Sequence, residues 1–398
     1  MDGVIILISN FVHHYIKKII TYTYMCKKRK TNGDMKMKKQ FFQTLGLATA
    51  LLFMFFTISM LTGCLTVTES KENIITAFPV KNGIVKAVSA TVENVDPYKA
   101  GKTAAHRIKA RLGGTMPHII VVFDSYGQLL QKKDVIDGVA SVFERDIIVG
   151  GGVDGVYSQD GAFENDCVGI LAFAGDGVQI ETALVEQINV VGLSMKKNKV
   201  ELEKTLGDAG AQLAMKLPNA KSADFMFLMV DASSPKNQFF LHGIQSAIGE
   251  KLPITGGSNN KPNGLNYLYY RGGFYQNSAW GMTVKGVNFV VKQTGLQAKT
   301  NNAVIGAAKK GAIRLARELS KVKAKPFLLT AVDCAGRMNK LDDLNDELAA
   351  IKKAVGPYLT IFGSYCAGQY GVAEIKGTKT TKAVGRKWHV MFSMLGEK

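Results

Sequence analysis

FLLTAVDCAGR (residues 327–337) and TIFGSYCAGQYG (residues 360–371) are the two stretches of sequence that decide the fold. Each opens with an apolar run of the length and composition that buried strands have. Between them, residues 344–355 carry apolar side chains at helical spacing. We therefore predict a strand, a helix that returns along the sheet, and a second strand beside the first. The two strand ends would meet at one edge of the sheet, where ligands commonly bind in α/β proteins.

The same order of elements occurs twice more upstream. Three apolar runs each end in an aspartate, and these aspartates are Asp124, Asp231 and Asp333. The short strand expected after each run ends in a glycine, and these glycines are Gly150, Gly256 and Gly363. The aspartates lie 107 and 102 residues apart and the glycines 106 and 107, which indicates three copies of one unit.

Each copy is expected to hold a helix, a strand, a second helix and a group of strands. Several strands in succession without helices imply sheets that are at least partly antiparallel. We predict an α/β protein with layered, mixed or largely antiparallel sheets, helices on the outer faces and three internal α/β repeats of about 105 residues. The predicted repeats cover 96–220, 221–300 and 301–398.

The amino-terminal part of the chain has the pattern of an export signal. A basic run from Met35 to Lys39 precedes an apolar stretch from Leu45 to Leu61. LTGC (residues 61–64) follows at once and resembles the bacterial lipobox, in which the cysteine is acylated. We predict lipidation of Cys64. An uncleaved transmembrane anchor is the alternative, since residues 41–61 are long enough to span a bilayer.

These features divide the beginning of the chain into three segments. Residues 1–34 are interpreted as a non-native upstream extension, 35–63 as a lipoprotein signal peptide and 64–95 as a tether. The expected location is the exported side of a bacterial cell envelope, with the protein held at a membrane by lipid. Leu65 stands where an aspartate would favour inner-membrane retention, so the outer membrane is favoured if two are present.

The charge pattern gives no indication of nucleic-acid binding. The formal net charge is +18, but residues 1–63 contribute nine basic and two acidic side chains, or +7, which leaves +11. The remaining lysines are scattered and lack interleaved aromatic residues. We expect solvated surface lysines, with an anionic membrane or envelope polymer as the contact. The histidines after Cys64 show neither metal-ligand nor triad spacing, so no metal or cofactor is predicted.

Cys334 and Arg337 form the sharpest chemical pair in the sequence. The planar guanidinium of Arg337 could hold a carboxylate, and its charge could lower the pKa of the Cys334 thiol. The alternatives are a solvated arginine and a small packing cysteine. Cys167, Cys334 and Cys366 make an odd number, which excludes a disulfide framework but leaves a Cys334–Cys366 bridge open.

Two glycine clusters follow predicted strands, at residues 150–152 and 256–257. Glycines at such a point let the backbone turn tightly and expose N–H groups to a polar or anionic ligand. Neither cluster opens into a helix, which excludes a dinucleotide-binding or P-loop motif. Tight turns between strands are the alternative.

Three motifs resemble the FIST domain family, and the resemblance covers nearly all of the chain after about residue 90. The motifs are LPITGG (252–257), CAGR (334–337) and FGSYCAGQYG (362–371). The last is similar to the family's aromatic-rich segment that ends in Gly-Glu-Ile-Gly, although Gln369 replaces the glutamate. GGG (150–152) stands where the amino-terminal half often has Cys-Ser-Thr. The resemblance implies FIST N and FIST C halves and a sensory module that binds small ligands, with amino acids proposed as ligands.

We therefore predict a lipid-anchored envelope protein whose FIST-like domain binds a small polar ligand. The candidate ligand-binding residues are Arg337, Cys334, Gly256, Gly257, Gly363, Tyr365 and Gln369. One alternative is a hydrolase or transferase that uses Cys334 as a nucleophile, and the other is a structural or partner-binding lipoprotein, which closed glycine ends would favour. The sequence has no separate kinase or methyl-accepting region, so sensing would need a protein partner.

Overall fold

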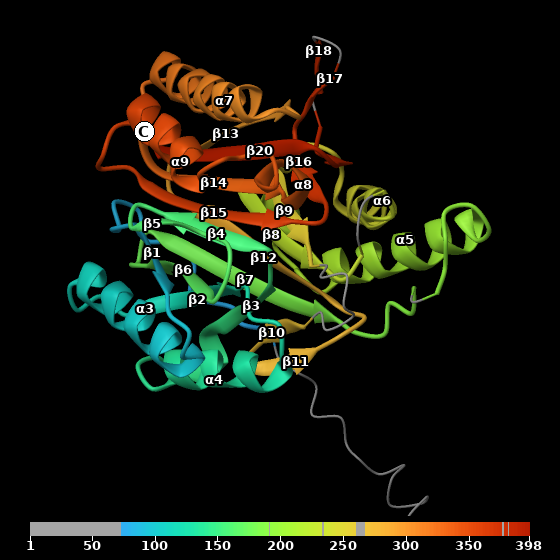
Figure 1. The fold of residues 1–398 in the computed structure, drawn as a ribbon, viewed down its shortest axis with the longest axis horizontal. Coiled ribbons are helices and arrows are strands. Elements are labelled where there is room, and N and C mark those ends of the chain that lie inside the picture. The colour runs from blue at the N-terminus through green and yellow to red at the C-terminus, as the bar shows by residue number, and fades with distance from the viewer. Residues whose placement is uncertain (1–72, 191, 233–234, 260–266, 376–377, 381) are drawn as a thin grey trace, which may run out of the picture. The chain divides into compact units, whose positions relative to one another are not determined.

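A computed structural model describes residues 73–190, 192–232, 235–259, 267–375, 378–380 and 382–398. These residues form three six-stranded sheets of mixed pairing with helices packed outside them (Figure 1). The predicted signal peptide and Cys64 lie outside the described residues. Within the described part of the chain, no helix is both long and apolar enough to cross a membrane.

Three successive stretches of the chain, residues 86–174, 178–286 and 289–397, each build the main part of one sheet. We call these stretches the repeats from here on, and their bounds differ from the predicted 96–220, 221–300 and 301–398. The first contributes β1 (Lys86–Glu93), α3 (Pro97–Leu112), β2 (Pro117–Asp124), α4 (Leu129–Ala140), β3 (Ile148–Gly152) and β6 (Cys167–Ala174). The second contributes β7 (Val178–Val185), α5 (Lys199–Met215), β8 (Phe225–Val230), α6 (Asn237–Ile248), β9 (Ile254–Ser258) and β12 (Ala279–Gly286). The third contributes β13 (Phe289–Gln297), α7 (Asn301–Lys321), β14 (Lys325–Cys334), α8 (Ala335–Met338), α9 (Leu344–Val355), β15 (Thr360–Cys366) and β20 (His389–Glu397).

The helices begin and end where the local sequence favours it. Asp96 caps α3, because its side chain accepts from Lys99 N, and Pro97 fits the first turn. The helix ends at Gly113, whose left-handed φ of 60° suits glycine. Asp343 caps α9 in the same way, accepting from Asn345 N. The bounds of α9 are those predicted from its apolar spacing.

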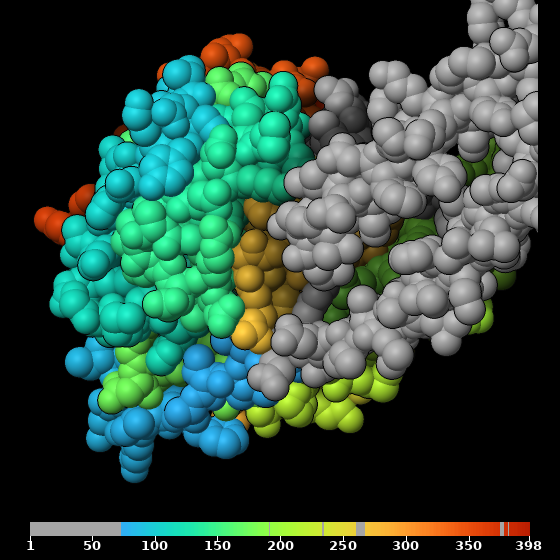
Figure 2. All heavy atoms as spheres, turned by 90° about the horizontal axis from the view of Figure 1, so that it is seen from below, coloured from blue at the N-terminus to red at the C-terminus, as the bar shows by residue number. Residues whose placement is uncertain are grey.

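Each repeat also lends strands to a sheet built by another repeat. β4 (Gly155–Ser158) pairs with β15, β10 (Leu268–Tyr270) pairs with β3, and β16 (Gln369–Gly371) pairs with β9. β5 (Gly161–Phe163), β11 (Gly273–Tyr275) and β19 (Val384–Arg386) extend these additions. In Figure 2 the amber surface near residue 270 borders the teal surface of the first repeat. The sequence did not predict this exchange, because a short hairpin does not encode which strand it joins.

The remaining elements are short. They are the 3-10 turns η1 (Arg145–Ile147) and η2 (Ala220–Ser222), and the hairpin of β17 (Glu374–Ile375) and β18 (Thr378–Lys379).

The inner faces of the three sheets share one apolar core. Phe123 of β2, Phe227 of β8 and Phe362 of β15 belong to it, with ring centroids 6.0 Å apart for Phe123 and Phe227 and 5.4 Å apart for Phe123 and Phe362. The outer faces are covered by α3 with α4, by α5 with α6, and by α7 with α9 (Figure 1). This arrangement confirms the predicted fold class of repeated α/β layers.

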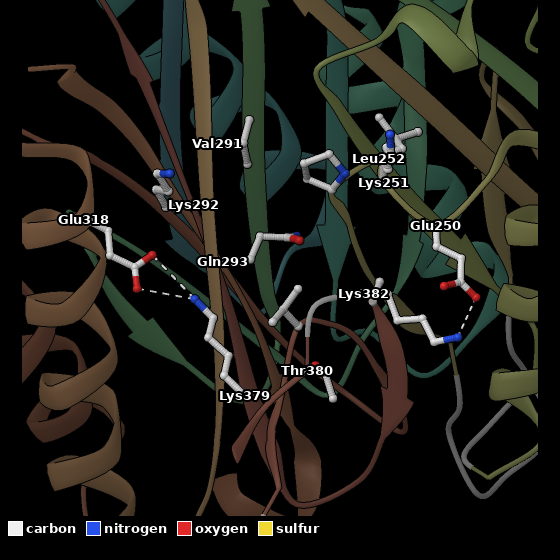
Figure 3. A pocket seen from close by; sticks show the side chains of 13 residues that line it. Glu250, Lys251, Leu252, Val291, Lys292, Gln293, Glu318, Lys379, Thr380 and Lys382 are labelled. Atoms are coloured by element: carbon white, nitrogen blue, oxygen red, sulfur yellow. Dashed lines mark hydrogen bonds and ion pairs between the residues drawn. The ribbon is translucent and has the colours of Figure 1, made fainter. Parts of the chain in front are cut away.

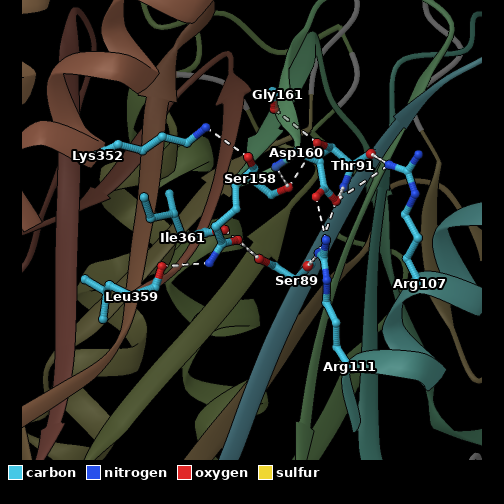
Figure 4. Close-up of polar contacts among 11 residues, drawn as sticks. Ser89, Thr91, Arg107, Arg111, Ser158, Asp160, Gly161, Lys352, Leu359 and Ile361 are labelled. Atoms are coloured by element: carbon cyan, nitrogen blue, oxygen red, sulfur yellow. Dashed lines mark hydrogen bonds and ion pairs between the residues drawn. The ribbon is translucent and has the colours of Figure 1, made fainter. Parts of the chain in front are cut away.

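Polar contacts close the joint between the third and first sheets (Figure 4). Ser89 Oγ of β1 donates to Ile361 O at 2.7 Å, and Thr360 Oγ1 donates to Ala87 O at 2.7 Å. Asp160, in the turn between β4 and β5, pairs with Arg111 of α3. The lent hairpin is thus fixed to the first sheet by side chains as well as to the third by its ladder.

Candidate functional site

The predicted meeting of strand ends occurs in all three repeats. β2 and β3, β8 and β9, and β14 and β15 are parallel neighbours. In the third repeat Cys334 lies opposite Cys366 in the register. The carboxyl ends of these strands therefore bring the predicted site residues to one edge of each sheet.

A tyrosine from a lent strand lies opposite a glycine at each of these ends. The pairs are Tyr269 with Gly150, Tyr370 with Gly256, and Tyr157 with Gly363. A Cβ on Gly363 would lie 2.1 Å from the Tyr157 ring, and one on Gly256 would lie 2.0 Å from Leu228 O. A Cβ on Gly257 would lie 2.6 Å from Cys366 Sγ. Close packing therefore explains why these positions are glycines. Exposure of their N–H groups to a ligand, which the sequence suggested, is not needed to explain them.

Arg337 is the centre of a buried ionic network at the third strand end. Its Nε lies 3.0 Å from Asp333 Oδ1, and its Nη2 lies 2.7 Å from Glu347 Oε1. Tyr365 donates its hydroxyl to Glu347 Oε2 at 3.0 Å. Arg337 is 0% exposed, and Nη1 donates to Leu296 O. Its planar fork therefore holds protein carboxylates rather than facing solvent.

Burial dominates the electrostatics of this network. Desolvation raises the pKa of Asp333 well above its ordinary value, and Arg337 offsets part of that shift. Desolvation also raises the pKa of Tyr365, with a further contribution from Glu347. Two carboxyl groups meet one guanidinium here, so the raised pKa of Asp333, which favours its neutral form, reduces the imbalance of buried charge.

The cysteines at this end are buried thiols. Cys334 and Cys366, like Cys167, are free among the described residues, although the register brings the first two together. Burial raises the pKa of Cys366 to about 12, so its thiol stays protonated at neutral pH. Within the described chain no hydrogen bond joins Cys334 Sγ to a base, so no observation favours the enzyme alternative.

Gln369 also lies at this edge and is fully buried. Its Nε2 donates to Cys366 O at 2.9 Å, while Oε1 has no hydrogen-bond partner in the part of the chain that the structure describes. It is opposite Gly257 in the ladder between β16 and β9, so it borders the second strand end.

The first strand end is closed by a second buried ion pair. Lys132 of α4 lies with Nζ 2.8 Å from Asp124 Oδ1, and both side chains are almost inaccessible to solvent. Tyr269 donates its hydroxyl to Asp124 Oδ2. A Cβ on Gly152 would lie 2.7 Å from Lys132 Nζ, so that glycine makes room for the ammonium group.

Three neutral side chains lie on segments that adjoin the second strand end. Asn237, Asn259 and Ser278 are fully buried, and their side-chain polar atoms have no hydrogen-bond partner among the described residues. We call these three residues the amide cluster. Asn259 N donates to Val230 O at 3.0 Å, and Asp231 N donates to Ser278 O at 2.9 Å, so Asn259 and Ser278 both adjoin the end of β8.

The amide cluster reaches both neighbouring repeats. Asn237 Oδ1 lies 3.1 Å from the position of a Cβ on Gly385, which is paired with Tyr370. Asn259 Oδ1 lies 3.7 Å from the corresponding position on Gly152, beside Lys132. The second strand end thus differs from the other two in that its unpaired side chains are neutral, whereas buried ion pairs hold the first and third ends.

Sequence reasoning missed Lys132, Glu347 and the amide cluster. A signal existed for the first two, since Lys132 precedes Ile136 by four residues and Glu347 precedes Ile351 by four, which places both on apolar helix faces. A charged residue on such a face must find a buried partner. Asn259 carries no comparable signal, because asparagine after a strand is the usual turn residue.

Comparison with known proteins identifies one family and only remote structural likeness. Residues 118–315 match the family model described as the FIST N domain. A search among curated proteins finds no match.

The structural likenesses include a cyanuric acid hydrolase from A. caulinodans, 10% identical, with a TM-score of 0.40 over 79% of this chain and 99% of that one. PurLQS from Thermotoga maritima is 11% identical, with a TM-score of 0.28 over 79% of this chain and 73% of that one. Scores this low carry no functional conclusion.

Proposed function

This chain is a FIST domain protein, with its FIST N domain at residues 118–315, and we propose from that premise that it binds a small polar ligand at the amide cluster. A FIST domain itself suggests a sensory role in which a small ligand is bound. The finer proposal places the ligand at the second strand end and makes an amino acid its leading candidate.

The unpaired atoms of the amide cluster are the observation that carries the proposal. Leaving a buried donor or acceptor without a partner costs about 1–3 kcal/mol, so such groups are rare unless a ligand or water completes them. Asn237 and Asn259 each offer two amide donors and a carbonyl acceptor, and Ser278 adds a hydroxyl. A ligand that carries both donors and acceptors would satisfy them together.

The chemistry of the cluster favours a neutral or zwitterionic solute. Its own side chains carry no charge, while the charges nearby are already bonded, as in the Lys132–Asp124 pair. An isolated ion would find no counter-charge in the cluster itself. A free amino acid, whose two charges cancel, fits this balance.

The predicted site residues take different roles in this proposal. Arg337, Cys334, Tyr365 and Gly363 support the closed third strand end, and Gly256 and Gly257 support the packing of β9. Gln369 lies opposite Gly257 of β9 and keeps one unpaired acceptor, so it is the predicted residue that we assign to ligand contact.

Thermal unfolding tests the binding site. The melting temperature of the protein should rise in the presence of at least one member of a panel of amino acids and small polar metabolites, because a ligand that binds only the folded state stabilises it. Asn259→Ala should abolish this rise. Asn302→Ala, which changes an exposed asparagine on α7, is the matched control and should retain it. Equal responses of the two variants would contradict the site, and a flat panel would contradict ligand binding.

We also propose that Cys64 is lipidated and holds the protein at the cell envelope, at the outer membrane where the source has two. The lipobox-like LTGC motif after a basic and apolar leader supports this. Metabolic labelling with a clickable palmitate analogue should mark the protein but not Cys64→Ser. The Cys64→Ser variant should also move from the membrane fraction to the aqueous fraction. Label retained by Cys64→Ser would contradict lipidation at this residue.

A further inference from the structure

The joint between the second and third sheets is bridged by one side chain and also holds a hollow. β13 occupies in the third sheet the edge position that β1 occupies in the first, and the lent strand β16 corresponds to β4. Gln293 of β13 donates to Ile254 O of β9, as Ser89 of β1 donates to Ile361 O of β15 at the joint in Figure 4. Beside this bond a hollow of about 400 Å³ lies between β13, the start of β9 and the segment that leads into β19 (Figure 3).

Lysines dominate the charge of this hollow. Its lining includes Lys251, Lys292, Lys379 and Lys382 against two acidic residues, Glu250 and Glu318. Lys379 pairs with Glu318 at 3.3 Å and Lys382 pairs with Glu250 at 2.5 Å, on opposite sides of the hollow (Figure 3). The lining therefore keeps an excess of two positive charges.

Lys251 and Lys292 supply that excess. Neither has an acidic partner within the described chain, and each comes from a different repeat. Lys251 follows α6 and is exposed, whereas Lys292 is half-buried on β13. Figure 3 shows Lys292 on the opposite side of β13 from Lys251, so the two ammonium groups raise the positive potential of the hollow from both sides of this edge strand rather than meeting at one point.

The floor of the hollow is fixed by a buried glutamine. Gln293 Nε2 donates to Ile254 O and to Ser393 Oγ, both at 2.9 Å, and Gln293 extends between the two ion pairs (Figure 3). Its donors are already in use, so the lysines must supply the hydrogen bonds to a ligand. Lysine ammonium groups bind carboxylate and phosphate oxygens as point charges.

We propose that this hollow is a second ligand site, which binds a small dianion carrying carboxylate or phosphate groups. Its volume lies within the range of small-molecule pockets. Two negative charges would match the excess of the lining without displacing Glu250 or Glu318. The site shares no lining residue with the amide cluster, so it stands or fails independently of the function proposed above.

Isothermal titration with succinate and with inorganic phosphate, at constant ionic strength, tests the site. The full chain should bind at least one of the two probes, and Lys251→Gln/Lys292→Gln should weaken that binding at least about tenfold. Lys109→Gln/Lys353→Gln removes two exposed lysines from α3 and α9 and is the matched control. Its affinity should change less than about twofold, and Asn259→Ala should bind the dianion as the unchanged protein does.

Three results would overturn the proposal. The first is the absence of binding of either probe at millimolar concentration. The second is an equal loss of affinity in the two double lysine variants. The third is that neither small dianion binds, while phosphatidylglycerol vesicles sediment the protein and only Lys251→Gln/Lys292→Gln prevents this. The hollow would then contact a membrane surface instead of a small solute.

Discussion

The third and second strand ends occupy the same position in their repeats but differ in their buried polar side chains, which are ion-paired at the third end and neutral and unpaired at the second. At the third end Arg337 pairs with Asp333 and Glu347, and Tyr365 donates to Glu347, while Asp333 Oδ2 has no hydrogen-bond partner among the described residues. At the second end Asn237, Asn259 and Ser278 remain without partners among the described residues. This difference is the basis of our proposal that the second strand end binds a ligand while the third stabilises the fold.

The most damaging change should be Arg337→Met. It leaves Asp333 and Glu347 buried without a counter-charge, and removing one partner of a buried ion pair costs about 3–5 kcal/mol. Urea unfolding should show this loss of stability. Arg317→Met, at an exposed position of α7, should change the free energy of unfolding by less than about 0.5 kcal/mol. Similar losses in both variants would remove the distinction between the two strand ends.

A smaller loss is expected from Tyr365→Phe. The change leaves Glu347 Oε2 without its donor in a fully buried site, which should cost about 1–3 kcal/mol. Tyr358→Phe is the control, because Tyr358 is 97% exposed. A free energy of unfolding equal to that of the unchanged protein would show that the hydroxyl plays no part in the network.

The pH dependence of stability should separate the two ends further. The pKa of Asp333 is raised by burial, so protonation favours the folded state, and this contribution is lost as pH rises from the ordinary value of 3.8 toward the folded pKa. Asp333→Asn should therefore lose less stability between pH 4 and pH 7 than the unchanged protein does. Parallel pH profiles from urea unfolding would contradict this assignment.

The smallest effect should come from Ser278→Ala in the amide cluster. Removing an unpaired buried hydroxyl should leave the ligand-free protein unchanged or up to about 1 kcal/mol more stable. Ser89→Ala is the matched change, because Ser89 donates to Ile361 O and should lose about 1 kcal/mol. A destabilised Ser278→Ala would mean that this hydroxyl already has a partner.

The sequence predicted the local elements better than their partners. Apolar spacing located α9, and the three aspartates located the ends of the central strands, because both signals depend on neighbouring residues alone. The lent hairpins were not predicted, since their pairing is decided by tertiary contacts.

The predicted site residues meet at the third strand end, whereas the ligand site that we propose lies at the second. The sequence predicted that Cys334, Arg337 and Gln369 lie at one strand end, and the structure places them there. It could not show that Arg337 would be enclosed by Asp333 and Glu347, because Glu347 comes from a helix whose rotation is set by packing. Nor could it single out Asn259, whose significance lies in the bonds that it lacks.

The exchange of strands affects how the protein folds. Ser158 of β4 pairs with Phe362 of β15, so a hairpin near the start of the domain cannot pair until a strand 204 residues later is available. Such distant pairing slows folding and makes the final steps cooperative. The hairpin of β4 and β5 has no partner strand until the third repeat has been synthesised, so the three repeats should fold together. A chain truncated before β15 should therefore be sensitive to proteolysis along its whole length.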